Sequence, residues 1–301
     1  MAPTTLQWTP RLRLWILSKL LVMLRHSLDP TLLSICLALE RRTENPRWIS
    51  SKRFTIAFCS TTSPDCLRRK TQPITIDMKL SDKTQVILQN FTSINQSLSF
   101  KEGRKIRTIS PMQNVLAEAE IEEYIPKDFA IYDLPQFLNT VGLYRDPDID
   151  VSTEDTHAMI REGKMNRSKY FFSDPSVIIA PPEKEMQLPT EDVCFIVQQE
   201  QLKRIQKSSA ILGLPDLSVI GEAGVVKLVV SDRKNDTSND FQIVVGQTQH
   251  EFCFNFKIEN IKLVPGSYEV VISRKNLARF FNSALNLTYF IALEPDSQYN
   301  D

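Results

Sequence analysis

One pattern occurs twice between residue 81 and the C-terminus: a predicted helix followed by several short predicted strands. Apolar residues recur at helical spacing over 82–95 and again over 199–212, and Ser81 can cap the first of these helices. After each helix come short stretches in which apolar and polar residues alternate, as they do in half-buried strands. The repetition predicts an α+β fold made of two similar halves.

Each half is also predicted to contain a second, shorter helix and to end in the same way. Asp133 can cap a helix that Gly142 ends, and 257–263 is predicted as its counterpart in the second half. Lys169-Tyr-Phe-Phe172 and Thr288-Tyr-Phe-Ile291 are both followed closely by an acidic residue and Pro, and their tyrosines stand 119 residues apart. Such a unit buries one face of an antiparallel sheet under helices. Two unrelated α+β domains are the alternative interpretation.

Charge and composition change together near residue 78. Residues 1–77 carry 12 Lys and Arg against 5 Asp and Glu, a net charge of +7, whereas residues 78–301 carry 24 against 31, a net charge of −7. All three Trp precede this point and all eight Gly follow it. We therefore expect an N-terminal extension at 1–77, a first domain at 78–180, a Pro-rich linker at 181–190 and a second domain at 191–301.

The extension is rich in Leu over 12–39, but charged residues interrupt it before any run reaches the roughly 18 apolar residues of a membrane-spanning helix. Its Leu, Ser and Arg content is typical of unselected sequence upstream of a start, which would then be Met78. We expect 1–77 to be non-functional or disordered. A targeting peptide and a membrane-surface helix are the alternatives.

The sequence after residue 78 lacks the usual patterns of catalytic and metal sites. Its two histidines, His157 and His250, have no nearby partner pattern, and no glycine-rich phosphate loop is present. Among the glutamates at 118, 120, 122 and 123, Glu118 and Glu120 alternate with apolar residues, as on the solvent face of a strand. The whole chain has five cysteines, of which Cys194 and Cys253 lie after residue 78, and the absence of short spacing indicates reduced thiols. We expect no enzyme, no cofactor and no metal.

Four strings in this part of the chain resemble the sliding clamp of T-even-like bacteriophages. They follow the same order as in that family and are Met78-Lys-Leu-Ser81, Phe129-Ala-Ile-Tyr-Asp-Leu-Pro-Gln-Phe-Leu138, Phe254-Asn-Phe-Lys-Ile258 with Pro265-Gly-Ser-Tyr268, and Tyr289-Phe-Ile-Ala-Leu-Glu-Pro-Asp-Ser297. The 224 residues from Met78 to Asp301 also equal one clamp protomer in length. Residues 145–170 and 222–250 depart from the family pattern.

The resemblance implies two similar clamp-type domains, and a homotrimer closed into a ring around duplex DNA, with sheets outside and helices inside. A clamp of this kind is not an enzyme; an ATP-driven clamp loader places it on DNA, and it tethers the replicative DNA polymerase. In this phage family it also assists late transcription. The place of action would be the cytoplasm of the bacterial host, with no membrane partner.

A ring that slides must hold phosphates without reading bases, and Lys and Arg side chains do this. Lys203 and Lys207 lie one helical turn apart beside Arg204, on the face away from Leu202 and Ile205. We expect these three to face DNA, joined by Lys83, Lys257 and Lys262. The alternative is an ordinary solvated helix face.

The resemblance also implies an apolar pocket for partner peptides beneath the linker. Its candidate residues lie before the linker and at the C-terminus: Val177, Ile178, Ile179, Pro181, Ala292, Leu293 and Pro295. The alternative is that 177–179 forms an ordinary core strand. For the whole chain, the alternative functions are a non-ring replication accessory or DNA-binding protein of two α+β domains, and a membrane-associated protein anchored by 12–39.

Overall fold

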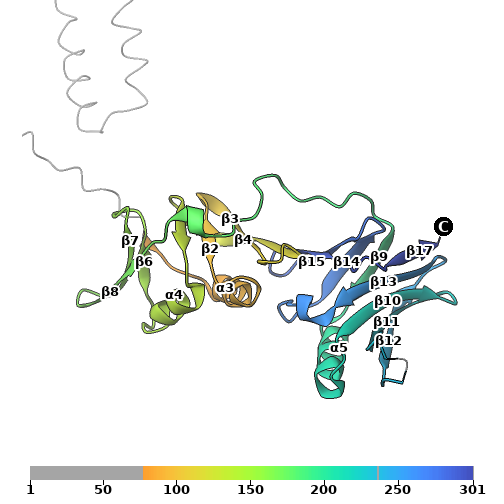
Figure 1. Ribbon diagram of the computed structural model, residues 1–301. Helices are drawn as coiled ribbons and strands as arrows, with labels where there is room; N and C mark the ends of the chain where they lie inside the picture. The colour runs from red at the N-terminus through yellow and green to blue at the C-terminus, as the bar shows by residue number, and fades with distance from the viewer. Residues whose placement is uncertain (1–76, 236, 301) are drawn as a thin grey trace, which may run out of the picture. The chain divides into compact units, whose positions relative to one another are not determined.

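The computed structural model describes residues 77–235 and 237–300, so the expectations for the N-terminal extension lie outside the described residues (Figure 1). The first half of the fold runs from β1 to β8. Its elements are β1 (Asp77–Met78), α3 (Asp82–Ile94), β2 (Leu98–Phe100), β3 (Gly103–Ile109), β4 (Val115–Ile125), β5 (Phe129–Ile131), α4 (Leu134–Val141), β6 (Asp148–Asp150), β7 (His157–Glu162) and β8 (Asn166–Phe171).

The second half runs from β9 to β17. Its elements are β9 (Val193–Val197), α5 (Gln199–Leu212), β10 (Asp216–Glu222), β11 (Val225–Ser231), β12 (Phe241–Gln247), β13 (Glu251–Lys257), η3 (Ile258–Asn260), β14 (Tyr268–Ser273), β15 (Leu277–Asn282), β16 (Leu287–Ala292) and β17 (Gln298–Asn300). Between the halves lie the single turn η2 (Pro175–Val177) and residues 178–192, which contain no helix or strand and arch from one half to the other (Figure 1). We call 178–192 the linker.

The two halves have similar strand topologies. In each half the first strand pairs with three later strands, in the order β1-β6-β7-β8 in the first half and β9-β14-β15-β16 in the second. The middle strands of the second half follow the order β12-β11-β10-β13, and in the first half β4 pairs with β3 and β5 pairs with β2. The α+β fold of two similar halves is therefore confirmed. The repeated Tyr-Phe ending lies on the equivalent strands β8 and β16.

Local chemistry explains where the two long helices begin and end. The Ser81 hydroxyl accepts a hydrogen bond from the Thr84 N–H at the start of α3, while Ile87 and Phe91 are buried on one face. Helix α5 ends at Gly213, which has a left-handed backbone (φ +66°) that a side chain would strain. Among the described residues, no helix has both the length and the apolar character needed to cross a bilayer.

One expected helix and one alternative for the linker are wrong. The segment 257–263 is not a helix: β13 continues through Lys257, and only the turn η3 follows it. Pro265 disfavours the helical conformation at Val264, so little room is left for a helix. The segment 177–179 is not a core strand, because it leaves η2 without pairing to any described strand.

The halves share one sheet, in which β4 of the first half pairs antiparallel with β16 of the second. The strand order of this sheet is β3-β4-β16-β15-β14-β9. One face of β4 and β16 joins the main core with Ala117, Tyr289 and Ile291, all buried. We call the β4–β16 junction the inner seam.

Candidate functional site

Three basic side chains stand together on the exposed face of α5. Leu202 and Ile205 are buried against the sheet, which leaves Lys203, Arg204 and Lys207 on the outside. None of the three forms an ion pair with a carboxylate in the described part of the chain; Arg204 instead lies over the Phe241 ring, 5.6 Å from its centroid. Their charges are therefore free to meet an anion.

The other three predicted DNA-facing lysines already have partners. Lys83 at the start of α3 pairs with Glu122 (3.0 Å). Lys257 is at the end of β13, where its hydrogen bond to the buried Asp216 raises the pKa of Lys257 above its usual value. Lys262, beyond η3, donates to the Ser93 carbonyl in the last turn of α3 (2.6 Å). The geometry thus brings together only the α5 residues, and sequence spacing could not reveal the partners of the rest.

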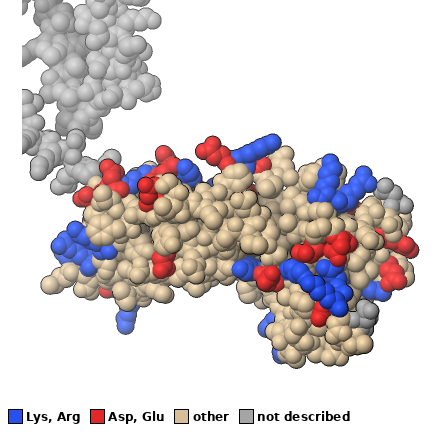
Figure 2. Space-filling model, in the orientation of Figure 1, with Lys and Arg blue, Asp and Glu red and all other residues tan. Residues whose placement is uncertain are grey.

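Charges of both signs are interspersed over the visible face of the molecule (Figure 2). On β4, Glu118 pairs with Arg107 (3.3 Å) and Glu120 accepts from Asn286 (2.8 Å). Burial alone would raise the pKa of Glu123, but hydrogen bonds from Ser81 and Thr84 outweigh it and lower that pKa. Within the described residues, no group of three or more His, Cys, Asp or Glu is placed to hold a metal ion.

The predicted partner-peptide residues lie on two separate segments. Val177 at the end of η2 and Ile179 in the linker are exposed, while Ile178 between them is buried and Pro181 is half-buried. At the end of β16, Ala292 is half-buried, Leu293 is buried and Pro295 is exposed. The Asn95 amide donates to the Ile179 carbonyl (3.4 Å), which ties the first segment to the end of α3.

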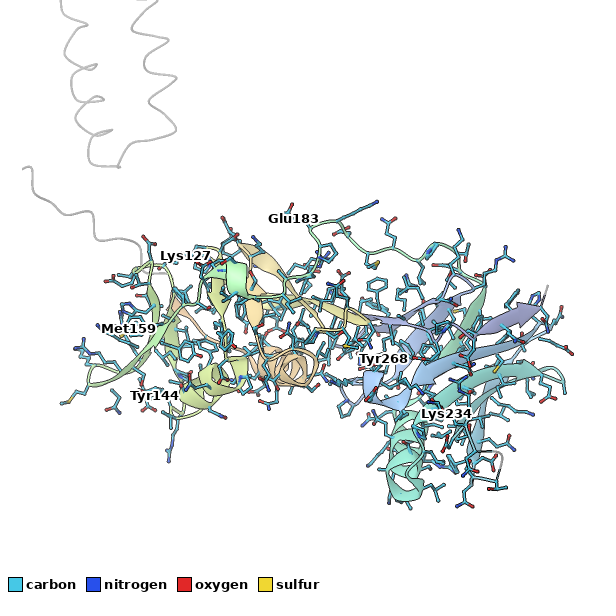
Figure 3. The ribbon with its side chains drawn as sticks, in the orientation of Figure 1. Lys127, Tyr144, Met159, Glu183, Lys234 and Tyr268 are labelled. Carbon is cyan, nitrogen blue, oxygen red and sulfur yellow. The ribbon has the colours of Figure 1, made fainter. Side chains whose placement is uncertain are left out.

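An apolar cluster beneath the linker was missed by the sequence reasoning. The face of the shared sheet opposite the helices buries three residues, Ile109, Leu116 and Phe290. Leu277 of β15 and Met186 of the linker pack against them. The linker is held there by the Lys105–Glu185 ion pair (2.7 Å) and by Arg107, which donates to the Pro182 carbonyl (2.7 Å). Glu183 is labelled on this segment in Figure 3. The consecutive apolar residues Val115-Leu116-Ala117 were the available signal, because a strand buried on both faces does not alternate.

The sequence is similar to family models and to known proteins over most of the described residues. A family model described as "DNA polymerase processivity factor" matches residues 79–180, and one described as "gp45 sliding clamp, C terminal" matches residues 194–295. The sliding clamp of Vibrio phage KVP40 is 33% identical over 224 residues, which cover 72% of this chain and 99% of that protein. The sliding clamp of Enterobacteria phage T4 is 30% identical over 234 residues, covering 74% and 100%.

Solved structures give the same fold at much lower identity. Proliferating cellular nuclear antigen from Entamoeba histolytica superposes with a TM-score of 0.56 at 13% identity, over 72% of this chain and 97% of that one. A. fulgidus PCNA, solved bound to the C-terminal region of FEN-1, gives 0.55 at 13% identity, over 74% and 99%.

Proposed function

The chain belongs to the sliding-clamp family of DNA polymerase processivity factors, which are not enzymes, and on that premise we propose that three copies close into a ring around duplex DNA with their helices inside. The observation that carries the proposal is the repeated topology of the two halves. We also propose that the ring tethers the replicative DNA polymerase, is opened by an ATP-driven loader, assists late transcription and acts in the cytoplasm of the bacterial host.

The repeat indicates which edges join one copy to the next. In the inner seam, β16 ends the strand order β9-β14-β15-β16 of the second half and pairs with β4, the longer strand of the β3–β4 pair in the first half. Their counterparts are β8 and β12, each of which has a strand neighbour on one side only among the described residues. Pairing β8 of one copy antiparallel with β12 of the next repeats the inner seam. We call this junction the outer seam.

Exposed apolar side chains on both edges support the outer seam. Phe171 of β8 lies 119 residues before Phe290, the same separation as Tyr170 and Tyr289. Phe290 is 5% exposed within the inner seam, whereas Phe171 is 68% exposed and Val244 of β12 is 57% exposed. A second copy would cover both, and a head-to-tail interface of this kind forms a ring if its rotation closes.

Electrostatics favour DNA in the hole rather than outside. The residues from 78 onward carry a net charge of −7, which repels phosphate, yet α5 presents Lys203, Arg204 and Lys207 without carboxylate partners. If α5 lines the hole, the hole is the favourable position for duplex DNA. Lys83, Lys257 and Lys262, which are already paired, are weaker members of the proposed DNA-facing set.

Two further assignments stay proposals. We propose that 78–180 and 191–301 are the clamp domains, joined at 181–190. We also propose that 1–77 has no share in the function, because 72–74% of this chain matches 99–100% of the length of each phage relative. We also propose that partner peptides bind near Val177–Pro181 and Ala292–Pro295, beside the linker. The FEN-1 segment bound to A. fulgidus PCNA supports peptide binding as the mode.

Topology on DNA tests the ring. The protein is loaded on nicked circular DNA, the salt is raised, and the DNA is then cut with a restriction enzyme. A ring stays on circles at salt that removes direct phosphate binding, and it leaves when free ends appear. Equal retention on circles and linear DNA would overturn the proposal in favour of a non-ring DNA-binding protein.

A further inference from the structure

Helices α3 and α5 occupy equivalent places in the two halves and can be aligned by their buried residues. Thr84, Ile87 and Phe91 of α3 are buried, and each lies 118 residues before a buried residue of α5, namely Leu202, Ile205 and Ser209. Both helices follow the first strand of their half. The alignment therefore rests on packing and topology, and it identifies which exposed positions correspond.

The exposed faces that correspond are chemically different. At the same separation of 118 residues, Gln85, Val86 and Gln89 of α3 match Lys203, Arg204 and Lys207 of α5. All six side chains are exposed. The α5 face thus carries three positive charges where the α3 face carries none.

Nothing else on the first-half helices restores the missing charge. Lys83 is paired with Glu122, and Asp82 beside it cancels its charge along the helix. Helix α4, with the sequence LPQFLNTV, contains no charged residue at all.

We propose that α5 alone binds the DNA backbone. Around the hole of the ring, three basic α5 faces, here called basic stations, then alternate with three uncharged α3 faces that carry glutamine amides, here called neutral stations. This inference rests on the proposed ring, in which both helix faces line the hole. The basic stations hold phosphates by charge, and each neutralised phosphate contributes about 0.9 to the log–log salt slope. The Gln85 and Gln89 amides contribute no such salt-dependent attraction, so the attraction from these two helix faces of a protomer comes from the three α5 cations.

Exchanging the two faces tests the proposal on the full chain. The variants are K203Q with K207Q, which removes two of the three positive charges of the α5 face, Q85K with Q89K, which adds two to the α3 face, and all four together. Direct binding to a short linear duplex is measured against salt, and residence on nicked circles is measured in parallel. Neutralising α5 should lower affinity at least tenfold and flatten the slope, charging α3 should steepen it, and the fourfold variant should return toward the original.

The matched control is Q85A with Q89A, which keeps the α3 face neutral with a good helix former. We expect its salt slope and residence time to equal those of the unaltered chain. A loss as large as that of K203Q with K207Q would show that the first half also grips DNA and would overturn the proposal. Unchanged slopes in every variant would also overturn it, whereas the proposed ring itself would fail only if residence did not depend on circular DNA.

Discussion

The inner seam and the proposed outer seam use equivalent strands, but they differ in what accompanies the strand pairing. The inner seam pairs five residues of β16 with β4 and buries Phe290. Polar contacts reinforce it: Tyr289 donates to Asn90 (2.7 Å), and the Asn114 amide donates to Asn260 (3.0 Å). The first contact joins β16 to α3, and the second joins the turn between β3 and β4 to η3. Tyr268, whose ring centroid lies 6.1 Å from that of Tyr289, is labelled in Figure 3.

The outer-seam edges offer strand backbone and exposed apolar surface without a chain connection between the copies. Phe171 and Val244 remain exposed in one protomer, and covering an apolar side chain of this size is worth about 1.5–3 kcal/mol. If the outer seam closes the ring as proposed, we expect the inner seam to be permanent and the outer seam to be the place where the ring opens to admit DNA.

The largest effect is expected from a charge placed in the outer seam. Phe171→Asp should reduce the protein from trimer to folded monomer, because a carboxylate buried without a partner costs several kcal/mol in each of three junctions. Sedimentation measures the mass, and circular dichroism measures the fold. Met112→Asp is the control, since Met112 is equally apolar and 82% exposed but lies in the turn between β3 and β4. An equal loss of the trimer in both variants would contradict this location of the seam.

The equivalent phenylalanines should respond differently to truncation. Phe290→Ala should lower the free energy of unfolding by about 3–5 kcal/mol, because it leaves a cavity in a packed cluster. Phe171→Ala should change the unfolding of dissociated protomers by less than about 0.5 kcal/mol and instead weaken assembly. Urea unfolding over a range of protein concentrations separates these effects. Similar destabilisation of the dissociated protomer by both variants would mean that Phe171 belongs to a protomer core.

A smaller loss is expected from the polar part of the inner seam. Tyr289→Phe removes the hydrogen bond to Asn90 and leaves the buried Val264 N–H, which donates to the Tyr289 hydroxyl (3.2 Å), without that acceptor. The expected cost is about 1–3 kcal/mol in urea unfolding, with the trimer retained. Loss of the trimer without loss of protomer stability would show that the inner seam is not the permanent one.

The smallest effect is expected for Lys262→Met. The Lys262 ammonium donates to the Ser93 carbonyl across the halves, but both groups are exposed, so the loss should be only a few tenths of a kcal/mol. Urea unfolding at low and high salt measures it. If this variant also impairs DNA residence as strongly as K203Q with K207Q, Lys262 faces DNA despite its contact with Ser93.

Periodicity was enough to predict the long helices and many of the strands. The spacing of Leu202 and Ile205 predicted α5, and the alternation of Phe252, Phe254 and Phe256 predicted β13. Strands β7 and β15 were not predicted, because their charged and apolar residues do not alternate over a long enough stretch. The prediction of a short helix over 257–263 was wrong. Strand β13 continues through Lys257, and Pro265 leaves too few residues after it for more than the turn η3.

The site was less predictable, because its chemistry depends on residues far apart in the sequence. Glu122, Asp216 and the Ser93 carbonyl engage three of the six predicted DNA-facing cations, and local spacing reveals none of these partners. The α5 face was predictable because helical geometry alone sets Lys203 and Lys207 opposite Leu202. The apolar cluster beneath the linker is built by strands from both halves. The sequence could therefore suggest only that Leu116, within a run of apolar residues, is buried.

Disulfide cross-linking across the outer seam tests most directly whether the edges β8 and β12 close the ring. The full chain carrying Phe171→Cys with Val244→Cys is oxidised mildly at low concentration, and each single variant serves as a control for the native cysteines. We expect a covalently closed species of three chains on a denaturing gel, seen only in the double variant. A trimer by native mass that never cross-links in the double variant, or a ladder extending beyond three chains, would contradict it.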